Sequence, residues 1–371
     1  MSDRKRIGIA GAGSIAFGTA ALLHQHGHVP MLWSPSGAGT AALEAAPLCA
    51  DGAITTEFRV RIAQSAKQLA EENDALIVAL PAYGHKAVMD ALAPHVRNGQ
   101  HIIISSHASL GAVYLTQVLA ARNVRAPITA WGTTAITGRK QSGTSVKINT
   151  VRSLIDLCTV QDAAADVNGV TFCRHLFGDC FQQRDGLLAI SLSNLNPQNH
   201  LGIALGNITR MERGEVWSQG QNVTPNVGRL LEQLDLERLA IAKALNLDVR
   251  TIFEHFHLSF HVPVASISEM NQAMHAQGNG GTGPASADSR YVTEDVPYGL
   301  QLTAVLGRLV GQPATLHEAG INIFSAMYGR DFTNENTILN ALELNRFDLN
   351  DLQRAARTGL LLVTPEPVSQ D

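Results

Sequence analysis

The chain has 371 residues, of which 45% are hydrophobic and 16% charged, and its formal net charge is −4. This length allows two domains with separate cores, and the small negative charge gives no general attraction to nucleic acid or anionic membranes. No window holds the roughly 18 uninterrupted apolar residues that a membrane-spanning helix needs. We therefore expect a globular protein whose partners include neither nucleic acid nor membrane.

The N-terminal residues and the spacing of the cysteines indicate in which cellular compartment the protein is expected. Residues 1–6 lead directly into a strand pattern, without an apolar signal segment. Cys49, Cys158, Cys173 and Cys180 are scattered and form no Cys-x-x-Cys pair. Such spacing is typical of reduced, structural thiols, so we expect a cytoplasmic protein.

The first half of the chain alternates short apolar runs with helical patterns. A helix is predicted over 14–26, directly after the first apolar run. Continuous apolar strands between helices predict a parallel-rich sheet with helices on both faces, so we expect an α/β Rossmann domain over 1–185. The strands are predicted at 6–10, 29–33, 74–80, 100–105, 127–131, 144–149 and 169–174.

The second half has mostly long helical patterns. Helices are predicted over 187–213, 227–245 and 249–260, and residues 297–299 introduce another. We therefore expect an all-helical substrate and catalytic domain over 186–371.

A glycine fingerprint follows the first strand. Gly11-x-Gly13-x-x-Ala16 stands at the start of the first helix, where Gly11 permits a tight turn and Gly13 lets the backbone approach a pyrophosphate. Ala16 allows the helix to pack closely on the strand, and the helix N-terminus offers free N–H groups to phosphates. We expect a dinucleotide to bind here, with Ser14 and Ile15 also in contact.

The loop after the second strand bears on cofactor choice. NAD enzymes often carry a carboxylate there, but this chain has Ser34 and Ser36 instead. These hydroxyls could donate hydrogen bonds to a 2′-phosphate, and Arg59 or Arg61 could reach in from nearby. The pattern favours NADP(H) over NAD(H).

Further cofactor contacts are predicted where later strands end. Leu80 and Pro81 close the strand at 74–80, and His107 follows the strand at 100–105. Ligands of open α/β sheets bind at the carboxyl ends of strands. We expect these residues to line the cofactor, with His107 on the nicotinamide side.

The second domain opens with a motif rich in polar residues. Asn196 is predicted to cap a helix that has Pro197 in its first turn, which would orient Asn199 and His200. The helix dipole disfavours a protonated histidine there, so a carboxylate partner would be needed. The alternative interpretation is that His200 is a core or capping residue without a catalytic role.

A second polar cluster runs from residue 289 to 299. Arg290 could clamp a carboxylate through two hydrogen bonds, and Asp295 could orient a histidine. Tyr298 is a further candidate for substrate contact. The alternative is an ion-paired surface loop.

Together these two motifs resemble the octopine/nopaline (opine) dehydrogenases, notably the compact bacterial carboxyethyl-norvaline type. The resemblance rests on Asn-x-x-x-His at Asn196 and His200 and on Arg-Tyr-x-x-Glu-Asp-Val-Pro from Arg290 to Pro297. It implies reductive condensation of a 2-oxo acid with the amino group of an amino acid or amine. It also implies a His200–Asp295 acid–base dyad, with Arg290 near a substrate carboxylate.

A metal is not expected. His255, His257 and His261 have a spacing that could suit a metal, but no convincing fourth ligand accompanies them. Hydride transfer from a pyridine nucleotide also requires no metal.

Two other functions stay open. One is a ketopantoate- or glycerol-phosphate-dehydrogenase-like reductase, although residues 187–209 lack the lysine typical of those families. The other is a binding protein that senses NADP(H) without catalysis. A homodimer is plausible from the apolar helical domain.

Overall fold

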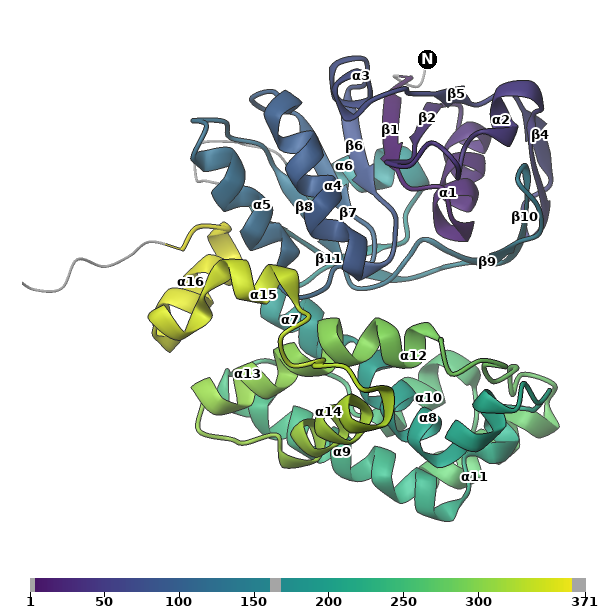
Figure 1. Cartoon of the computed structure of the whole chain (residues 1–371), viewed down its shortest axis with the longest axis vertical. Coiled ribbons are helices and arrows are strands. Elements are labelled where there is room, and N and C mark those ends of the chain that lie inside the picture. Colours follow the sequence, from purple (N-terminus) through teal and green to yellow (C-terminus); the bar gives the residue numbers. More distant parts are fainter. Residues whose placement is uncertain (1–3, 161–167, 362–371) are drawn as a thin grey trace, which may run out of the picture. The chain divides into compact units, whose positions relative to one another are not determined.

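The computed structural model describes residues 4–160 and 168–361. The chain forms two compact units, shown in Figure 1. The first contains the chain up to Ser191 together with the segment from Ala341 onward, and the second is Leu192–Asn340. The first is an α/β unit and the second is helical, which confirms the predicted fold class.

The first unit is built on an 8-stranded sheet. Its strands are β1 (Arg6–Ala10), β2 (Val29–Trp33), β5 (Arg61–Ile62), β6 (Ala75–Val78), β7 (His101–Ile104), β8 (Ile128–Trp131), β11 (Ile155–Val160) and β12 (Phe181–Gln183). Their order is β12-β11-β8-β7-β6-β1-β2-β5, and all neighbours are parallel except β11 and β8. The chain order reverses at β1, between β6 and β2, and such a switch point is where doubly wound sheets bind ligands.

A second, 4-stranded sheet covers the first helix of this unit. It has the order β4-β3-β10-β9 and contains β3 (Leu48–Gly52), β4 (Thr56–Phe58), β9 (Ile136–Lys140) and β10 (Ser145–Val151). The strand predicted at 144–149 therefore exists, but it belongs to this smaller sheet. A Cβ on Gly18 would lie 2.5 Å from the Ile136 side chain, so the glycine lets β9 approach the helix closely.

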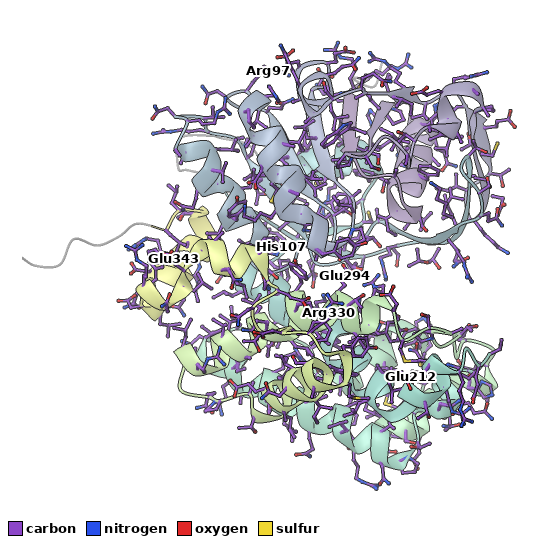
Figure 2. The ribbon with its side chains drawn as sticks, in the orientation of Figure 1. Arg97, His107, Glu212, Glu294, Arg330 and Glu343 are labelled. Atoms are coloured by element: carbon purple, nitrogen blue, oxygen red, sulfur yellow. The ribbon has the colours of Figure 1, made fainter. Side chains whose placement is uncertain are left out.

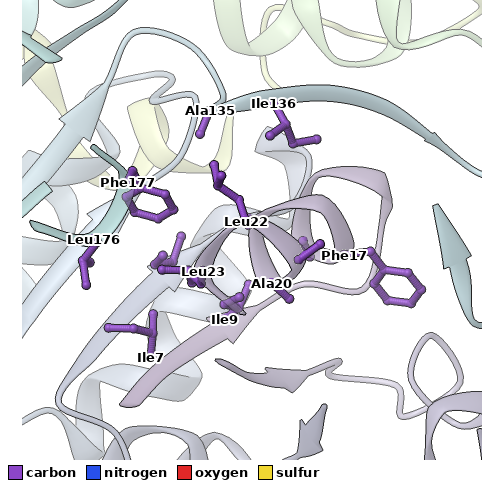
Figure 3. Close-up of a cluster of buried hydrophobic side chains, with 14 of the residues drawn as sticks. Ile7, Ile9, Phe17, Ala20, Leu22, Leu23, Ala135, Ile136, Leu176 and Phe177 are labelled. Atoms are coloured by element: carbon purple, nitrogen blue, oxygen red, sulfur yellow. The ribbon is translucent and has the colours of Figure 1, made fainter. Parts of the chain in front are cut away.

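Helices cover the remaining surfaces of the first unit. They are α1 (Ser14–Gln25), α2 (Ala42–Ala45), α3 (Ala66–Glu71), η1 (Ala82–Gly84), α4 (His85–Leu92), η2 (Ala93–His95), α5 (Gly111–Ala120), α6 (Gly169–Phe177), η5 (Leu344–Arg346) and α16 (Leu349–Thr358). Figure 3 shows how Ile7 and Ile9 of β1, Phe17 of α1 and Ile136 of β9 contribute to one apolar cluster. This burial is the main stabilising contribution to the unit.

The prediction of a strand at 169–174 is wrong, because this segment forms α6. The Asn168 side chain accepts a hydrogen bond from the Thr171 N–H and so caps the helix. Cys173, Leu176 and Phe177 are buried on one face, which is helical spacing. The local β-branched and aromatic residues suggested a strand, but the cap and this apolar face favour a helix.

The C-terminal segment also differs from the prediction, which assigned everything after residue 185 to the second domain. In the structure the segment from Ala341 groups with the first unit. Arg357 of α16 forms two hydrogen bonds of 2.9 Å with Asp185, and the backbone at Gly359 lies close to Thr116 of α5. These contacts join residues far apart in the sequence, so no local pattern could have indicated them.

The second unit is composed of helices. They are α8 (Asn196–Glu212), η3 (Gly220–Asn222), α9 (Pro225–Ala244), α10 (Ile252–Phe260), α11 (Ile267–Ala276), α12 (Arg290–Thr293), the π-helical turn η4 (Val296–Leu300), α13 (Gln301–Leu309) and α14 (Thr315–Tyr328). Two helices cross the boundaries between the units, α7 (Gly186–Ser193) and α15 (Thr337–Leu342). No helix among the described residues is both long and apolar enough to span a membrane.

The helix predicted over 187–213 is in fact α7 and α8, with a break before Asn196. The predicted N-cap is wrong as well. Asn196 is the first residue of α8, and its N–H donates to the Asn194 side chain at 3.1 Å. Pro197 occupies the first turn as expected, because its missing N–H is not needed there.

A buried polar network anchors the first turn of α8. Gln198 donates to Asp235 at 2.9 Å, and Arg238 donates to the same carboxylate oxygen at 2.9 and 2.7 Å. Asp235 and Arg238 are almost fully buried, so each charge depends on the other for compensation. The network fixes where α8 starts and thereby where its side chains point.

Candidate functional site

The glycine fingerprint forms the turn between β1 and α1. Gly11 has φ of +144°, and a Cβ there would lie 2.1 Å from the Ala79 carbonyl oxygen, so only glycine fits. Gly13 is exposed with nothing within 4 Å of its Cβ position, and no side chain caps α1. Ala16 is fully buried against the strand. The turn therefore offers open backbone N–H groups, which suits a phosphate group.

The neighbouring residues of the predicted cofactor site have mixed roles. The Ser14 hydroxyl accepts the Lys140 backbone N–H at 2.9 Å, and Ile15 is partly buried beside the core. Ser34 and Ser36 follow β2, with their hydroxyl oxygens 3.5 Å apart. These serines stand where the sequence predicts them, at the carboxyl end of β2.

The two arginines considered for this loop have other contacts. Arg61 pairs with Glu72, and Arg59 donates to the Glu44 carbonyl at 3.5 Å.

The loops after β6 and β7 hold the other predicted cofactor residues. The Leu80 carbonyl accepts from the His85 ring at 2.9 Å, and Pro81 is exposed. His107, labelled in Figure 2, is buried, and its Nε2 accepts the Ala112 N–H at 3.2 Å. Burial, with a smaller effect of His85, lowers the pKa of His107 to about 3. His107 is thus a neutral, buried ring held by its own loop.

The predicted catalytic pair meets in the second unit. His200 Nδ1 lies 2.6 Å from Asp295 Oδ2, and the side chains are only 12% and 9% exposed. Since a carboxylate accepts hydrogen bonds, the ring proton is assigned to Nδ1, which leaves Nε2 for another partner. No other hydrogen bond from His200 is found among the described residues. The geometry is that of a histidine oriented by an acid.

A tyrosine covers one face of this histidine. The rings of His200 and Tyr291 are stacked, with centroids 3.6 Å apart and planes 11° from parallel. The Tyr291 hydroxyl donates to Gln219 at 2.5 Å, and burial raises the pKa of this phenol to about 12, so it remains a donor. The sequence contained Tyr291 in its motif but indicated no role for it, and Gln219 had no signal.

The glycine-rich segment near Gln219 is tied to the unit. The Gln219 and Gly220 N–H groups donate to the carbonyls of Gly281 and Gly280. The Trp217 indole donates to the Pro284 carbonyl at 3.0 Å. These contacts support Gln219 and, through it, Tyr291.

Arg290 lies beside the pair and remains accessible. Its Nε is 3.9 Å from Asp295 Oδ2 and 3.8 Å from Glu294, which Figure 2 labels. The Arg290 side chain is 55% exposed, so its guanidinium can still take an anionic ligand. The structure thus brings together His200, Asp295 and Arg290, which are up to 95 residues apart.

The three other residues predicted to contact substrate have separate positions or partners. Asn196 is exposed at the start of α8. Asn199 has a buried side-chain oxygen without a hydrogen-bond partner. The Tyr298 hydroxyl donates to the Glu335 carbonyl at 3.2 Å, and the ring is buried. Their roles stay predictions.

Two of the three histidines in and directly after α10 have contacts or positions that belong to the fold. His257 Nδ1 lies 2.8 Å from the Val262 carbonyl, and His261 ends the helix in a left-handed conformation. In the part of the chain that the structure describes, no cluster of three or more His, Cys, Asp or Glu residues could hold a metal ion. All four cysteines are free thiols.

Two family models match, one in each half of the chain. Residues 183–328 match the model described as NAD/NADP octopine/nopaline dehydrogenase, alpha-helical domain. Residues 7–152 match the ketopantoate reductase PanE/ApbA model. The first range contains His200, Asp295 and Arg290, and the second contains the glycine fingerprint.

Relatives match over most of the length. An opine dehydrogenase of Arthrobacter sp. (strain 1C) is 30% identical over 282 residues, covering 74% of this chain and 76% of that protein. Octopine dehydrogenase in complex with NADH and agmatine has the same fold, with a TM-score of 0.79 at 16% identity over 96% of this chain and 98% of the other. Yersinopine dehydrogenase with NADP+ bound has a TM-score of 0.67 at 15% identity, with coverage of 96% and 98%. The chain therefore belongs to the octopine/nopaline (opine) dehydrogenase family and is an oxidoreductase that acts on CH–NH groups.

Proposed function

We propose that this protein is an NAD(P)H-dependent opine dehydrogenase that joins a 2-oxo acid to the amino group of an amino acid or amine. The observation that carries the proposal is the His200–Asp295 hydrogen bond of 2.6 Å with Arg290 beside it. Support comes from solved relatives named as octopine dehydrogenase with NADH and L-arginine, and with NADH and pyruvate.

The proposed reaction has two stages. Loss of water between the carbonyl group and the amine forms an imine, and addition of a hydride to its carbon and a proton to its nitrogen forms a secondary amine. When bound, the reduced nicotinamide supplies this hydride. The residues of the chain then have to move protons and hold a carboxylate.

His200 is the proposed acid–base group. Its Nε2 would take a proton from the amine and return one to the leaving hydroxyl, which is the role of general acid–base catalysis. Asp295 accepts from Nδ1 and so keeps one tautomer in one orientation, while its charge stabilises the imidazolium. This is why a carboxylate is needed near the first turn of α8, where the helix dipole opposes a positive charge.

Tyr291 and Arg290 would complete the site. The electron-rich face of Tyr291 lies against the His200 ring and favours its charged form. The exposed guanidinium of Arg290 would bind a substrate carboxylate through two parallel hydrogen bonds. Fixing the carboxylate in this way would place the neighbouring reacting carbon in one position.

The proposed cofactor site is the turn formed by Gly11 and Gly13, with Ser34 and Ser36 near the adenosine ribose. The absence of a carboxylate on the Ser34–Gly37 loop supports NADP(H) over NAD(H). We keep a cytoplasmic location and a homodimer as predictions.

A second candidate is a 2-oxo acid reductase without an amine substrate. The match of residues 7–152 to the ketopantoate reductase model favours it, because the two types share this domain. Residues 187–209, however, contain His200 and no lysine. A nucleotide-sensing protein without catalysis is a third possibility, which His200 and Asp295 argue against.

The test is oxidation of NADPH and NADH with pyruvate or glyoxylate plus a panel of amino acids, with each component omitted in turn. We expect oxidation only when oxo acid and amine are both present, and a product whose mass equals their sum minus water plus two hydrogens. Oxidation with the oxo acid alone would assign the protein to the hydroxyacid reductases. Tight cofactor binding without turnover on any pair would favour the sensing protein.

A further inference from the structure

Lys140, at the end of β9, reaches the glycine fingerprint from a distant part of the sequence. Its ammonium group donates to the Ala12 carbonyl at 3.0 Å and to the Gly39 carbonyl at 3.2 Å. It also lies 4.2 Å from the centre of the Phe17 ring, a favourable cation–π contact. The charge is therefore held where the fingerprint meets the loop after β2.

This charge has no negative partner. No carboxylate lies within ion-pair distance of Lys140 in residues 4–160 and 168–361. Partial burial lowers the pKa of Lys140, as expected for an ammonium group that loses water without gaining a counter-charge. Two carbonyls use two of its three N–H donors, so one donor remains for a ligand. A site of this kind favours an anion.

The position of the charge indicates which anion. A Cβ on Gly39 would lie 2.6 Å from Ala12 Cβ and 3.1 Å from Ser34 Oγ, so the loop after β2 folds back over the fingerprint. In Rossmann domains the end of β2 contacts the adenosine ribose, whose 2′ position carries the phosphate that distinguishes NADP from NAD. Lys140 and Ser34 thus both lie next to Gly39, on the loop that follows β2.

We infer that Lys140 and Ser34 form a binding site for the 2′-phosphate of NADP(H), an inference that rests on the proposed function. The Lys140 ammonium provides the charge, and the Ser34 hydroxyl provides a second donor. The site takes the place of the arginine that the loop after β2 lacks. Its lysine comes from the 4-stranded sheet rather than from the strand that carries the loop.

The test compares ligands that differ only in the 2′-phosphate. Adenosine 2′,5′-bisphosphate and 5′-AMP, and likewise NADPH and NADH, are titrated by calorimetry into the intact protein. We expect Lys140→Gln to weaken the binding of the bisphosphate and of NADPH by about 10- to 100-fold, because one charge-assisted hydrogen bond is lost. The binding of 5′-AMP and NADH should weaken by less than about 3-fold. Lys140→Met, which keeps an unbranched apolar side chain next to Phe17, gives the same pattern if Lys140→Gln fails to fold.

Lys147→Gln is the matched control. Lys147 is exposed on the neighbouring strand β10, so this change removes the same charge from the same sheet and leaves all four affinities unchanged. Lys140→Arg, which keeps the charge, restores part of the preference.

Two results would overturn the inference. Equal losses for all four ligands would place Lys140 at the phosphates that both cofactors share, and no loss in either variant would make it a structural residue. If the unmodified protein bound neither NADPH nor NADH, the proposed function itself would fail.

Discussion

The second unit contains two histidine–carboxylate pairs that differ in what surrounds them. His200 and Asp295 are 2.6 Å apart, and His317 and Glu237 are 2.8 Å apart. His317 is only 1% exposed, and Glu237 also accepts the N–H groups of Leu316 and His317 at the start of α14. Both carboxylate oxygens of Glu237 therefore accept hydrogen bonds from groups of the chain. The His200 side chain is more exposed, at 12%, and has a neighbouring, exposed arginine.

The comparison teaches that a bond to a carboxylate does not by itself indicate a catalytic histidine. Although burial opposes it, the bonds from His317, Leu316 and Thr315 hold the pKa of Glu237 below its ordinary value. That pair closes a helix end and stabilises the fold. In both pairs the carboxylate bonds Nδ1 of the ring, but the His200 side chain is 12% exposed and that of His317 only 1%, and proton transfer to a ligand needs a ring that can be reached.

The largest expected effect is on catalysis at His200. His200→Gln removes the acid–base group and should lower kcat about 1000-fold, while the dissociation constant for NADPH changes little. Steady-state kinetics and calorimetry measure the two quantities. If His317→Gln lowered kcat as much in a folded protein, the distinction between the two pairs would be lost.

The second effect is on stability at His317. His317→Gln removes the ring that bonds to Glu237, while the bonds from Thr315 and the backbone remain, and should lower the free energy of unfolding by about 2 kcal/mol. His200→Gln likewise removes the histidine from a buried carboxylate, Asp295, and should cost a similar amount, about 2 kcal/mol. Urea unfolding followed by circular dichroism checks both variants. The two variants should therefore differ in kcat and not in stability, and a loss of stability in only one of them would contradict this expectation.

A third kind of histidine has no carboxylate at all. His101 of β7 is buried, bonds to Thr129 Oγ1 at 2.6 Å, and burial lowers its pKa to about 4. The unfolded chain takes up a proton below about pH 6.5 while the folded state remains neutral. The contribution of His101 to the free energy of unfolding is therefore fully present above that pH. It falls by about 1.4 kcal/mol per pH unit as the pH drops toward 4.

His101→Asn removes this titrating group and should make the free energy of unfolding less dependent on pH. Urea unfolding between pH 7 and pH 4.5 measures this dependence. His26→Gln, at an exposed histidine of the same unit, is the control and should leave the slope unchanged. An unchanged slope in His101→Asn would show that His101 is not held neutral by burial.

The smallest expected effect concerns the stacked tyrosine. Tyr291→Leu removes the aromatic face against His200 and should lower kcat about 10-fold, because the ring loses the surface that holds its orientation. Tyr291→Phe keeps the face and loses only the bond to Gln219, so a change of about 2-fold is expected. Tyr328→Phe removes a hydroxyl that donates to Ala287 and serves as the control. Equal effects of Tyr291→Leu and Tyr291→Phe on kcat would contradict the role of the stacked face.

Much of the fold could be predicted from local patterns. The strands at β1, β2, β6, β7 and β8 were predicted within a few residues, because continuous apolar runs and a glycine turn are short-range signals. The helix α6 was misread as a strand, since periodicity in a short apolar segment is ambiguous. The boundary after residue 185 missed the return of α16 to the first unit.

The candidate site divides in the same way. The amino-acid sequence by itself determined the dinucleotide turn and the two motifs that contain His200, Asp295 and Arg290, because the chemistry needs those residue types at those spacings. Only the tertiary structure decided that Tyr291 stacks on His200 and that Lys140 reaches Ala12, a contact across 128 residues. The physical reason is that contacts across such distances depend on how helices and sheets pack, and packing leaves no periodic trace in the chain.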